Sequence, residues 1–171
     1  MSPQLLFGIS VLFSFLAWGA VARLYLWPFL RSQTRVGALR PILILHSFRF
    51  VGLAFLVPGV VSPDLPLAFA LPAAYGDLAA AVLALLALAT LRKGVGTILV
   101  WAFNLLGTAD LLYAFYNGSR TIVGLNPGLQ GAAYFLPTVG VPLLLVTHVL
   151  VFRLLLRREV GSVLQQERRA A

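Results

Sequence analysis

Long apolar stretches separated by short polar segments dominate the pattern of this chain. Five stretches can be drawn at residues 5–30, 41–61, 67–91, 95–116 and 132–156. Each has about the 20 residues that cross a bilayer core as a helix. They are rich in Leu, Ala and Val, and are far longer than the ~10-residue alternating strands of a membrane β-barrel. The pattern therefore predicts an all-α polytopic membrane protein, a bundle of five transmembrane helices.

The composition supports lipid as the surrounding solvent. The 171 residues are 60% hydrophobic and 11% charged, whereas soluble domains are roughly 45–50% apolar and about 25% charged. The chain has no cysteine, which excludes disulfides, thiolate metal sites and cysteine nucleophiles. The length fits a single transmembrane domain, residues 1–156, followed by a basic cytoplasmic tail, residues 157–171, that we expect to lie near anionic headgroups.

The distribution of cations predicts the orientation of the bundle. Three arginines lie between the first two stretches, Arg92 and Lys93 lie between the third and fourth, and five arginines lie near the C-terminus. The intervening segments hold one cation, Arg120, and one acid, Asp64. Because cytoplasmic loops are rich in Lys and Arg, the N-terminus is assigned to the outside and the C-terminus to the cytoplasm. This pattern accounts for most of the net charge of +8, so we expect no nucleic-acid partner.

The first stretch has a second interpretation. Residues 20–22, Ala-Val-Ala, resemble a signal-peptidase site after an apolar run. Against cleavage, no basic residue precedes the run, and the apolar pattern continues to about residue 30. The sequence alone leaves both interpretations open.

Polar side chains inside the predicted helices are the candidates for function, because an ionised group at a helix centre costs roughly 2.5–3.5 kcal/mol unless it is paired or hydrated. These residues are Arg23, His46, Arg49, Asp77, Asn104, Thr108, Asp110, Thr138, Thr147 and His148. A rise of ~1.5 Å per residue places the arginines and histidines in the inner half, and the aspartates at the middle and outside. We expect an ion pair between Arg49 and Asp77 within a buried polar cluster. Its expected members are Arg49, Asp77, Asn104, Asp110 and His148.

Helical geometry adds three expectations. His46 and Arg49 are three residues apart and should share a face. Asp110 is turned about 120° from Asn104, at about 100° per residue, so it faces either a different neighbour or the outer water. A polar cavity that opens outward is expected near the two aspartates, Thr138 and the prolines of the third and fifth helices.

Four sequence elements resemble an uncharacterised family of small bacterial multi-helix membrane proteins. They are FR at 48–49, YGD at 75–77, WAFNLLGTAD at 101–110 and LPTVGVPLLLVTHVLVFRL at 136–154. The family has comparable FR, GD or FD, WN and PT-x-x-VP-x-x-x-x-x-H-x-x-x-x-R elements in the same order. The resemblance covers most of the chain beyond the first helix. It implies a protein of the bacterial inner (plasma) membrane and carries no established activity.

Two interpretations of the polar cluster need no cofactor. In the first, its hydrogen bonds and ion pairs only fix the register of the helices. In the second, Asp77, Arg49 and His148 serve proton-coupled transport, because intramembrane ionisable residues often mark such paths and a histidine titrates near neutral pH. Against transport, the sequence has no visible inverted repeat.

A third interpretation is haem b held by His46 and His148. These are the only two histidines, they lie on different predicted helices, and both fall in the inner half. Arginines near the cytoplasmic side could then meet the haem propionates.

The fourth interpretation is a non-enzymatic accessory protein. Its partners would be membrane lipids, together with further copies in a homo-oligomer or another membrane subunit. An enzyme is not expected, because the sequence has no HExxH, no GxSxG and no acidic metal cluster. No catalytic residue or metal ligand is predicted.

Overall fold

The computed structural model describes residues 1–121 and 126–157. Its elements are α1 (Pro3–Val21), η1 (Ala22–Leu26), α2 (Trp27–Ser32), α3 (Arg35–Ser47), η2 (Phe48–Leu56), α4 (Leu67–Thr90), α5 (Gly94–Thr121), η3 (Pro127–Tyr134), η4 (Leu136–Gly140) and α6 (Val141–Leu156). Here η1 and η4 are π-helical turns, and η2 and η3 are 3-10 helices. The described part of the chain is thus helical and has no β-strand. The predicted basic tail lies, beyond residue 157, outside the described residues.

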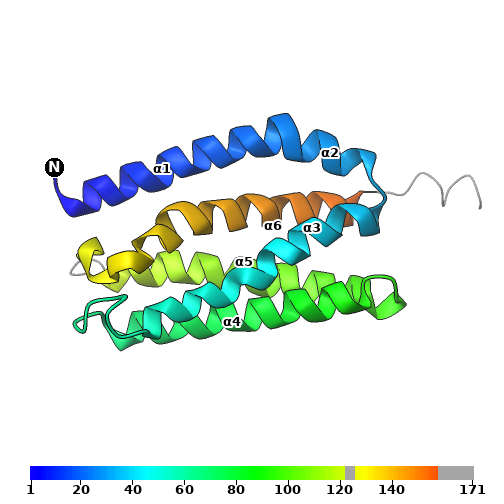
Figure 1. The fold of residues 1–171 in the computed structure, drawn as a ribbon. Coiled ribbons are helices and arrows are strands. Elements are labelled where there is room, and N and C mark those ends of the chain that lie inside the picture. The colour runs from blue at the N-terminus through cyan, green and yellow to red at the C-terminus, as the bar shows by residue number, and fades with distance from the viewer. Residues whose placement is uncertain (122–125, 158–171) are drawn as a thin grey trace, which may run out of the picture.

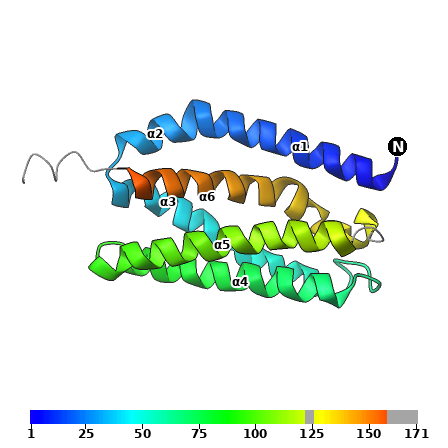
Figure 2. The ribbon, with the colours of Figure 1, turned by 180° about the vertical axis from the view of Figure 1, so that it is seen from behind.

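Five helical segments are long and apolar enough to cross a membrane. They are Pro3–Ser32, Arg35–Leu56, Leu67–Thr90, Gly94–Gly118 and Leu136–Leu156. They lie side by side as one bundle (Figures 1 and 2). The predicted all-α class and the five candidate spans are confirmed.

The second span is shifted from the predicted range of 41–61. It begins at Arg35, because the hydroxyl of Thr34 caps the helix by accepting a hydrogen bond from a backbone N–H of the first turn. Pro41 lies inside this helix instead of at its start. The span ends at Leu56, and a turn comes next in which Gly59 has φ +83°. Apolarity alone therefore misplaced both ends.

The fifth span begins later than the predicted residue 132. Gly131 has φ +51°, a left-handed conformation that interrupts the helical path and favours glycine. The backbone N–H of the next residue, Ala132, donates to the carbonyl of Val60 at 2.9 Å. The η3 segment is thereby tied to the η2–α4 connection, and the continuous span starts at Leu136.

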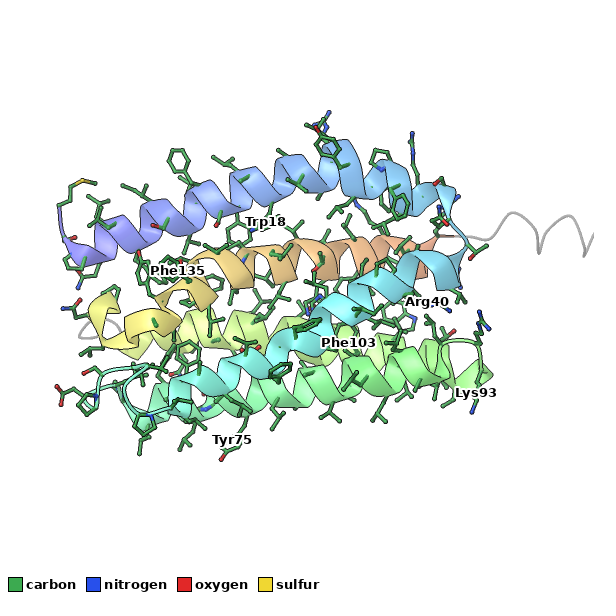
Figure 3. All side chains as sticks on the ribbon, viewed as in Figure 1. Trp18, Arg40, Tyr75, Lys93, Phe103 and Phe135 are labelled. Carbon is green, nitrogen blue, oxygen red and sulfur yellow. The ribbon has the colours of Figure 1, made fainter. Side chains whose placement is uncertain are left out.

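The predicted basic segments lie at one end of the bundle, which we call the basic end and define by Arg40, Lys93 and Arg157. Figure 3 labels Arg40 and Lys93 at this end. Nη1 of Arg157 donates to the carbonyl of Arg31 at 2.6 Å, which joins the end of α6 to α2. The N-terminus and the η2–α4 connection lie at the opposite end, the N-terminal end (Figures 1 and 2).

Two apolar cores fill the bundle, one toward each end. The core of the basic end includes Leu43, Ala84 and Phe103, and the core of the N-terminal end includes Phe55 and Ala74. Close packing of α4 rests on small residues, as its buried side chains show. Apart from Phe69, all of them are alanines: Ala70, Ala73, Ala74, Ala80, Ala81, Ala84 and Ala87. Along both α3–η2 and α4, the polar residues of the predicted cluster lie between the two cores.

Helix α1 contributes least to these cores. It has no buried residue, and it packs along α6, η3 and η4 at the edge of the bundle (Figure 1). Most of its surface consists of large exposed apolar side chains such as Leu12, Phe13 and Leu16. In a membrane, this surface would face lipid.

Candidate functional site

The guanidinium of Arg49 is the centre of the buried polar cluster. Its Nε donates to Oδ1 of Asp77 at 2.7 Å, and its Nη2 donates to Oδ2 of Asp110 at 2.6 Å. Its Nη1 donates to the carbonyl of Gly107 at 3.3 Å and lies 3.5 Å from Nε2 of His148. One side chain thus joins η2, α4, α5 and α6. The predicted contact between Arg49 and Asp77 is confirmed.

The 3-10 winding of η2 determines what surrounds this guanidinium. A 3-10 helix has three residues per turn, so residues three apart lie above one another. The buried residues of η2 have this spacing: Arg49, Gly52 and Phe55. His46, three residues before Arg49, is also fully buried. His46 and Arg49 both face the interior, as expected.

Helix α5 supplies three groups at the same three-residue spacing. Asn104 lies beside His148, the carbonyl of Gly107 accepts from Arg49, and Asp110 pairs with Arg49. The direction of Asp110, which the sequence left open, is therefore inward to the guanidinium. Gly107 and Asp110 are three residues apart, so they share a face of α5 and one guanidinium reaches both.

His148 is held by hydrogen bonds at both ring nitrogens. Its Nδ1 lies 2.7 Å from Oδ1 of Asn104. An amide oxygen can only accept, so Nδ1 carries the ring proton and donates it. The lone pair of Nε2 is left to face Nη1 of Arg49 at 3.5 Å. The neutral ring therefore donates to the amide oxygen of Asn104 on one side and presents a lone pair to the guanidinium of Arg49 on the other.

His46 has a different arrangement. Its Nε2 lies 2.9 Å from Oγ1 of Thr147. That hydroxyl donates its own proton to a backbone carbonyl, of Leu143 at 3.0 Å or Leu144 at 2.9 Å, so it accepts from Nε2 of His46. Nδ1 of His46 has no hydrogen-bond partner within the described residues. The ring therefore keeps one free acceptor in the interior.

The two histidines do not fit the predicted haem b site. Their ring centroids are 4.3 Å apart and their planes are tilted by 54°, so the imidazoles touch each other. Bis-imidazole ligation places the iron and the flat macrocycle between the two rings. Their Nε2 atoms instead face Thr147 and Arg49. Arg23, one of the arginines that could have met a haem propionate, is exposed on the surface of η1.

Glycines that the sequence analysis passed over allow the carboxylates to lie against helix backbones. A Cβ atom added to Gly52 would be 2.7 Å from Cγ of Asp77, and one added to Gly76 would be 2.6 Å from Cγ of Asp110. Both distances are shorter than any packing can tolerate. The neighbouring Tyr75 is 56% exposed and points away from the bundle (Figure 3). Within YGD, only the glycine and the aspartate face the cluster.

Gly107 has the same role for the cationic side of the cluster. An added Cβ would be 2.8 Å from Nε2 of His148 and 2.9 Å from Nη1 of Arg49. The three glycines lie on η2, α4 and α5, three of the four elements that meet at the guanidinium. Their spacing from a charged residue within an apolar stretch, one or three residues away in sequence, was the signal that could have revealed them.

A cavity of about 200 Å³ lies on the N-terminal side of the cluster. Its lining includes both aspartates, Pro137 of η4 and Gln4 of α1. The side chains of Asp77 and Asp110 are 15% and 20% exposed, whereas that of Arg49 is 1% exposed. The carboxylates therefore form the polar floor of the cavity, and the guanidinium is sealed behind them.

The remaining walls are more apolar than predicted. Phenylalanines from four elements line them: Phe7, Phe55, Phe69 and Phe115. Thr138 was expected there but does not line the cavity; it is buried, and its hydroxyl donates to the carbonyl of Tyr134 at 2.7 Å. Gln130 of η3, which the sequence analysis did not single out, also lines the cavity and is 1% exposed.

Fold and site together define a class: an all-helical protein with five potential membrane spans and a buried charge cluster beneath a cavity. The chain belongs to the family described as domain of unknown function DUF8737, whose family model matches residues 6–156. The match includes the first helix as well as the elements on which the resemblance was based. No curated protein and no solved structure matches the chain.

Replacing Gly107 with alanine tests how tightly the cluster is packed. We expect Gly107→Ala to lower the free energy of unfolding by about 1–3 kcal/mol, because the methyl group overlaps His148 and Arg49. Gly8→Ala is the control, since a Cβ there meets nothing within 4 Å, and alanine in an open helix position is neutral or stabilising by up to about 1 kcal/mol. Unfolding of both variants in detergent would be monitored by circular dichroism. Equal stabilities would contradict the packing described.

Removing the guanidinium tests the ion pairs. We expect Arg49→Met to cost about 3–5 kcal/mol of unfolding free energy, because two partly buried carboxylates lose their counter-charge. Adding Asp77→Asn and Asp110→Asn to the same chain should recover most of that loss. Arg23→Met, at an exposed position, is the control and should change the stability little. A triple variant as unstable as Arg49→Met would show that packing, and not charge, dominates.

Proposed function

We propose that this protein is a multi-pass protein of the bacterial inner membrane, with its N-terminus outside and its C-terminus in the cytoplasm. The five candidate spans and the gathering of Arg40, Lys93 and Arg157 at one end support this topology. Lipids would cover the exposed apolar surface. The family resemblance supports the bacterial membrane.

In this proposal the first helix is a retained part of the protein. Phe7 lines the cavity and packs edge-on against Tyr134, with ring centroids 5.9 Å apart. Oγ of Ser10 lies 3.5 Å from the hydroxyl of the same tyrosine. Cleavage after residue 22 would remove one wall of the cavity, so the contacts support a membrane anchor and not a signal peptide.

We further propose that the cluster and its cavity form the outward-facing site of a proton-coupled transport protein. One observation carries this proposal: the cavity ends on Asp77 and Asp110, and both are paired with the sealed Arg49. Ion pairs that only fix helix register are stronger when packing excludes water from them, because the local dielectric constant is then low. Here the two acidic partners stay open to a cavity that is large enough for a solute.

The charges of the site support the same proposal. Two carboxylates face one guanidinium, and each histidine is neutral in the hydrogen-bond pattern described above. With both carboxylates ionised, the cluster carries one negative charge too many. An uncompensated charge is costly at low dielectric. Uptake of a single positive charge through the cavity, by a proton or a cationic solute, would neutralise it.

On the basic side the site is closed. The ring of His46 packs against Phe103, with centroids 4.9 Å apart, and against His148. Beyond this layer lies the apolar core that includes Leu43 and Ala84. Release toward the cytoplasm therefore requires the histidine layer to rearrange, and the free Nδ1 of His46 offers an acceptor for a proton that passes it.

The topology can be tested with single cysteines, since the chain has none. Asp64 and Lys93 are both exposed, in the η2–α4 and α4–α5 connections. In intact cells, we expect Asp64→Cys to react with a membrane-impermeant maleimide and Lys93→Cys to react only after permeabilisation. The reverse pattern would overturn the orientation, and the unsubstituted chain controls for background labelling.

Proton coupling can be tested in proteoliposomes that contain a pH-sensitive dye. After an acid jump outside, with valinomycin to balance charge and a mixture of small organic cations present, we expect the protein to acidify the lumen. Asp110→Asn should slow this at least about tenfold, since intramembrane carboxylates carry such relays. Asp64→Asn removes the same charge from an exposed loop and should match the wild type. Acidification no faster than in empty vesicles would refute proton coupling.

A further inference from the structure

The cavity also indicates what kind of solute it binds. We propose that it takes a small organic monocation: a primary ammonium group on a compact apolar body with a single ring. This inference deepens the proposed function, because the ligand would be the transported solute. Binding itself can be measured without transport, so the two can fail separately.

The floor of the cavity is suited to an ammonium group. Asp77 and Asp110 each give one carboxylate oxygen to Arg49, at 2.7 Å and 2.6 Å. The second oxygen of each lies against a glycine, Gly52 or Gly76, and accepts no hydrogen bond from the described residues. Acceptors without donors, together with an excess negative charge, call for a ligand that has N–H groups and a positive charge. Anions are excluded by repulsion, and a quaternary ammonium has no N–H to offer.

An independent observation on the wall points the same way. Gln130 lines the cavity, is 1% exposed, and its Oε1 has no hydrogen-bond partner among the described residues. A buried amide oxygen without a donor costs roughly 1–3 kcal/mol. A donor group on a bound molecule would remove that cost. The cavity thus has unmatched acceptors on both its floor and its wall.

The size and the walls define the body of the ligand. At about 200 Å³, the cavity is smaller than the roughly 300–1,000 Å³ of sites for drug-sized molecules. Phe7, Phe55, Phe69 and Phe115 enclose it from four elements. Aromatic faces pack against a ring and also attract a cation. A single-ring amine satisfies the volume, the walls and the charge together.

The test uses purified full-length protein in lipid nanodiscs and isothermal titration calorimetry with 2-phenylethylamine. We expect saturable binding of the amine, with 2-phenylethanol, trimethyl(2-phenylethyl)ammonium and 3-phenylpropionate binding at least about tenfold more weakly, because each lacks the charge or the N–H donors. No binding of the amine, or equal binding of the alcohol, would overturn the inference. These comparisons use only the unsubstituted chain, so no variant needs to fold.

Variants then locate the site. Asp110→Asn should weaken amine binding by more than about tenfold, and Asp64→Asn should not. Ala114→Phe fills the cavity from α5 without changing the charge of the site and should also abolish binding. Tyramine carries a hydroxyl donor at its far end; it should bind more tightly than 2-phenylethylamine, and Gln130→Leu should erase that difference. Gln33→Leu, at an exposed position, is the matched control. Unchanged binding in Asp110→Asn and Ala114→Phe would place the amine elsewhere and refute the proposal.

The outcomes separate the two proposals. Amine binding without proton or amine flux in proteoliposomes would leave the ligand assignment standing and remove transport. Proton flux in a protein that binds none of these amines would leave proton-coupled transport standing and remove the ligand assignment.

Discussion

A single buried guanidinium determines how this bundle is put together. Arg49 cannot remain in an apolar interior unless its N–H groups are matched, and the partners come from three other helices: Asp77 on α4, Asp110 and Gly107 on α5, and His148 on α6. Because the apolar interior offers no alternative partners, these contacts fix the register of the helices against one another. The two apolar cores pack on either side of that fixed layer.

Arg49 and its partners divide the protein into two halves that are packed differently. Toward the N-terminal end, the helices leave a cavity whose floor is acidic. Toward the basic end, touching rings of His46, His148 and Phe103 merge into continuous apolar packing. A charge can therefore approach Arg49 from one side only. This asymmetry favours the proposed site, which takes up a solute from one side. It is not expected of ion pairs that only fix the register of the helices.

Features that follow from apolarity and from the cost of burying charge could be predicted from the sequence. Apolar length and the need to pair intramembrane charges led to the five spans and to the Arg49–Asp77 contact. The winding of η2 was not predictable, because its other eight residues are all apolar or glycine and carry no period. The contact between His46 and His148 was not predictable, because it depends on the relative heights of α3 and α6 to within a few ångströms. Counting residues does not give that precision. Gln130 was missed because it lies just before the fifth predicted stretch, where no apolar pattern indicates which side chains are buried.

The 3-10 winding of η2 has a mechanical consequence for the second span. Nine residues at about 2.0 Å each extend it farther than the ~1.5 Å rise of an α-helix would. Rewinding the segment to α-helical geometry would shorten it by roughly 4–5 Å and turn Phe55 by about 120° relative to Arg49. The winding of η2 therefore sets both the distance and the relative direction of Arg49 and the cavity-lining Phe55.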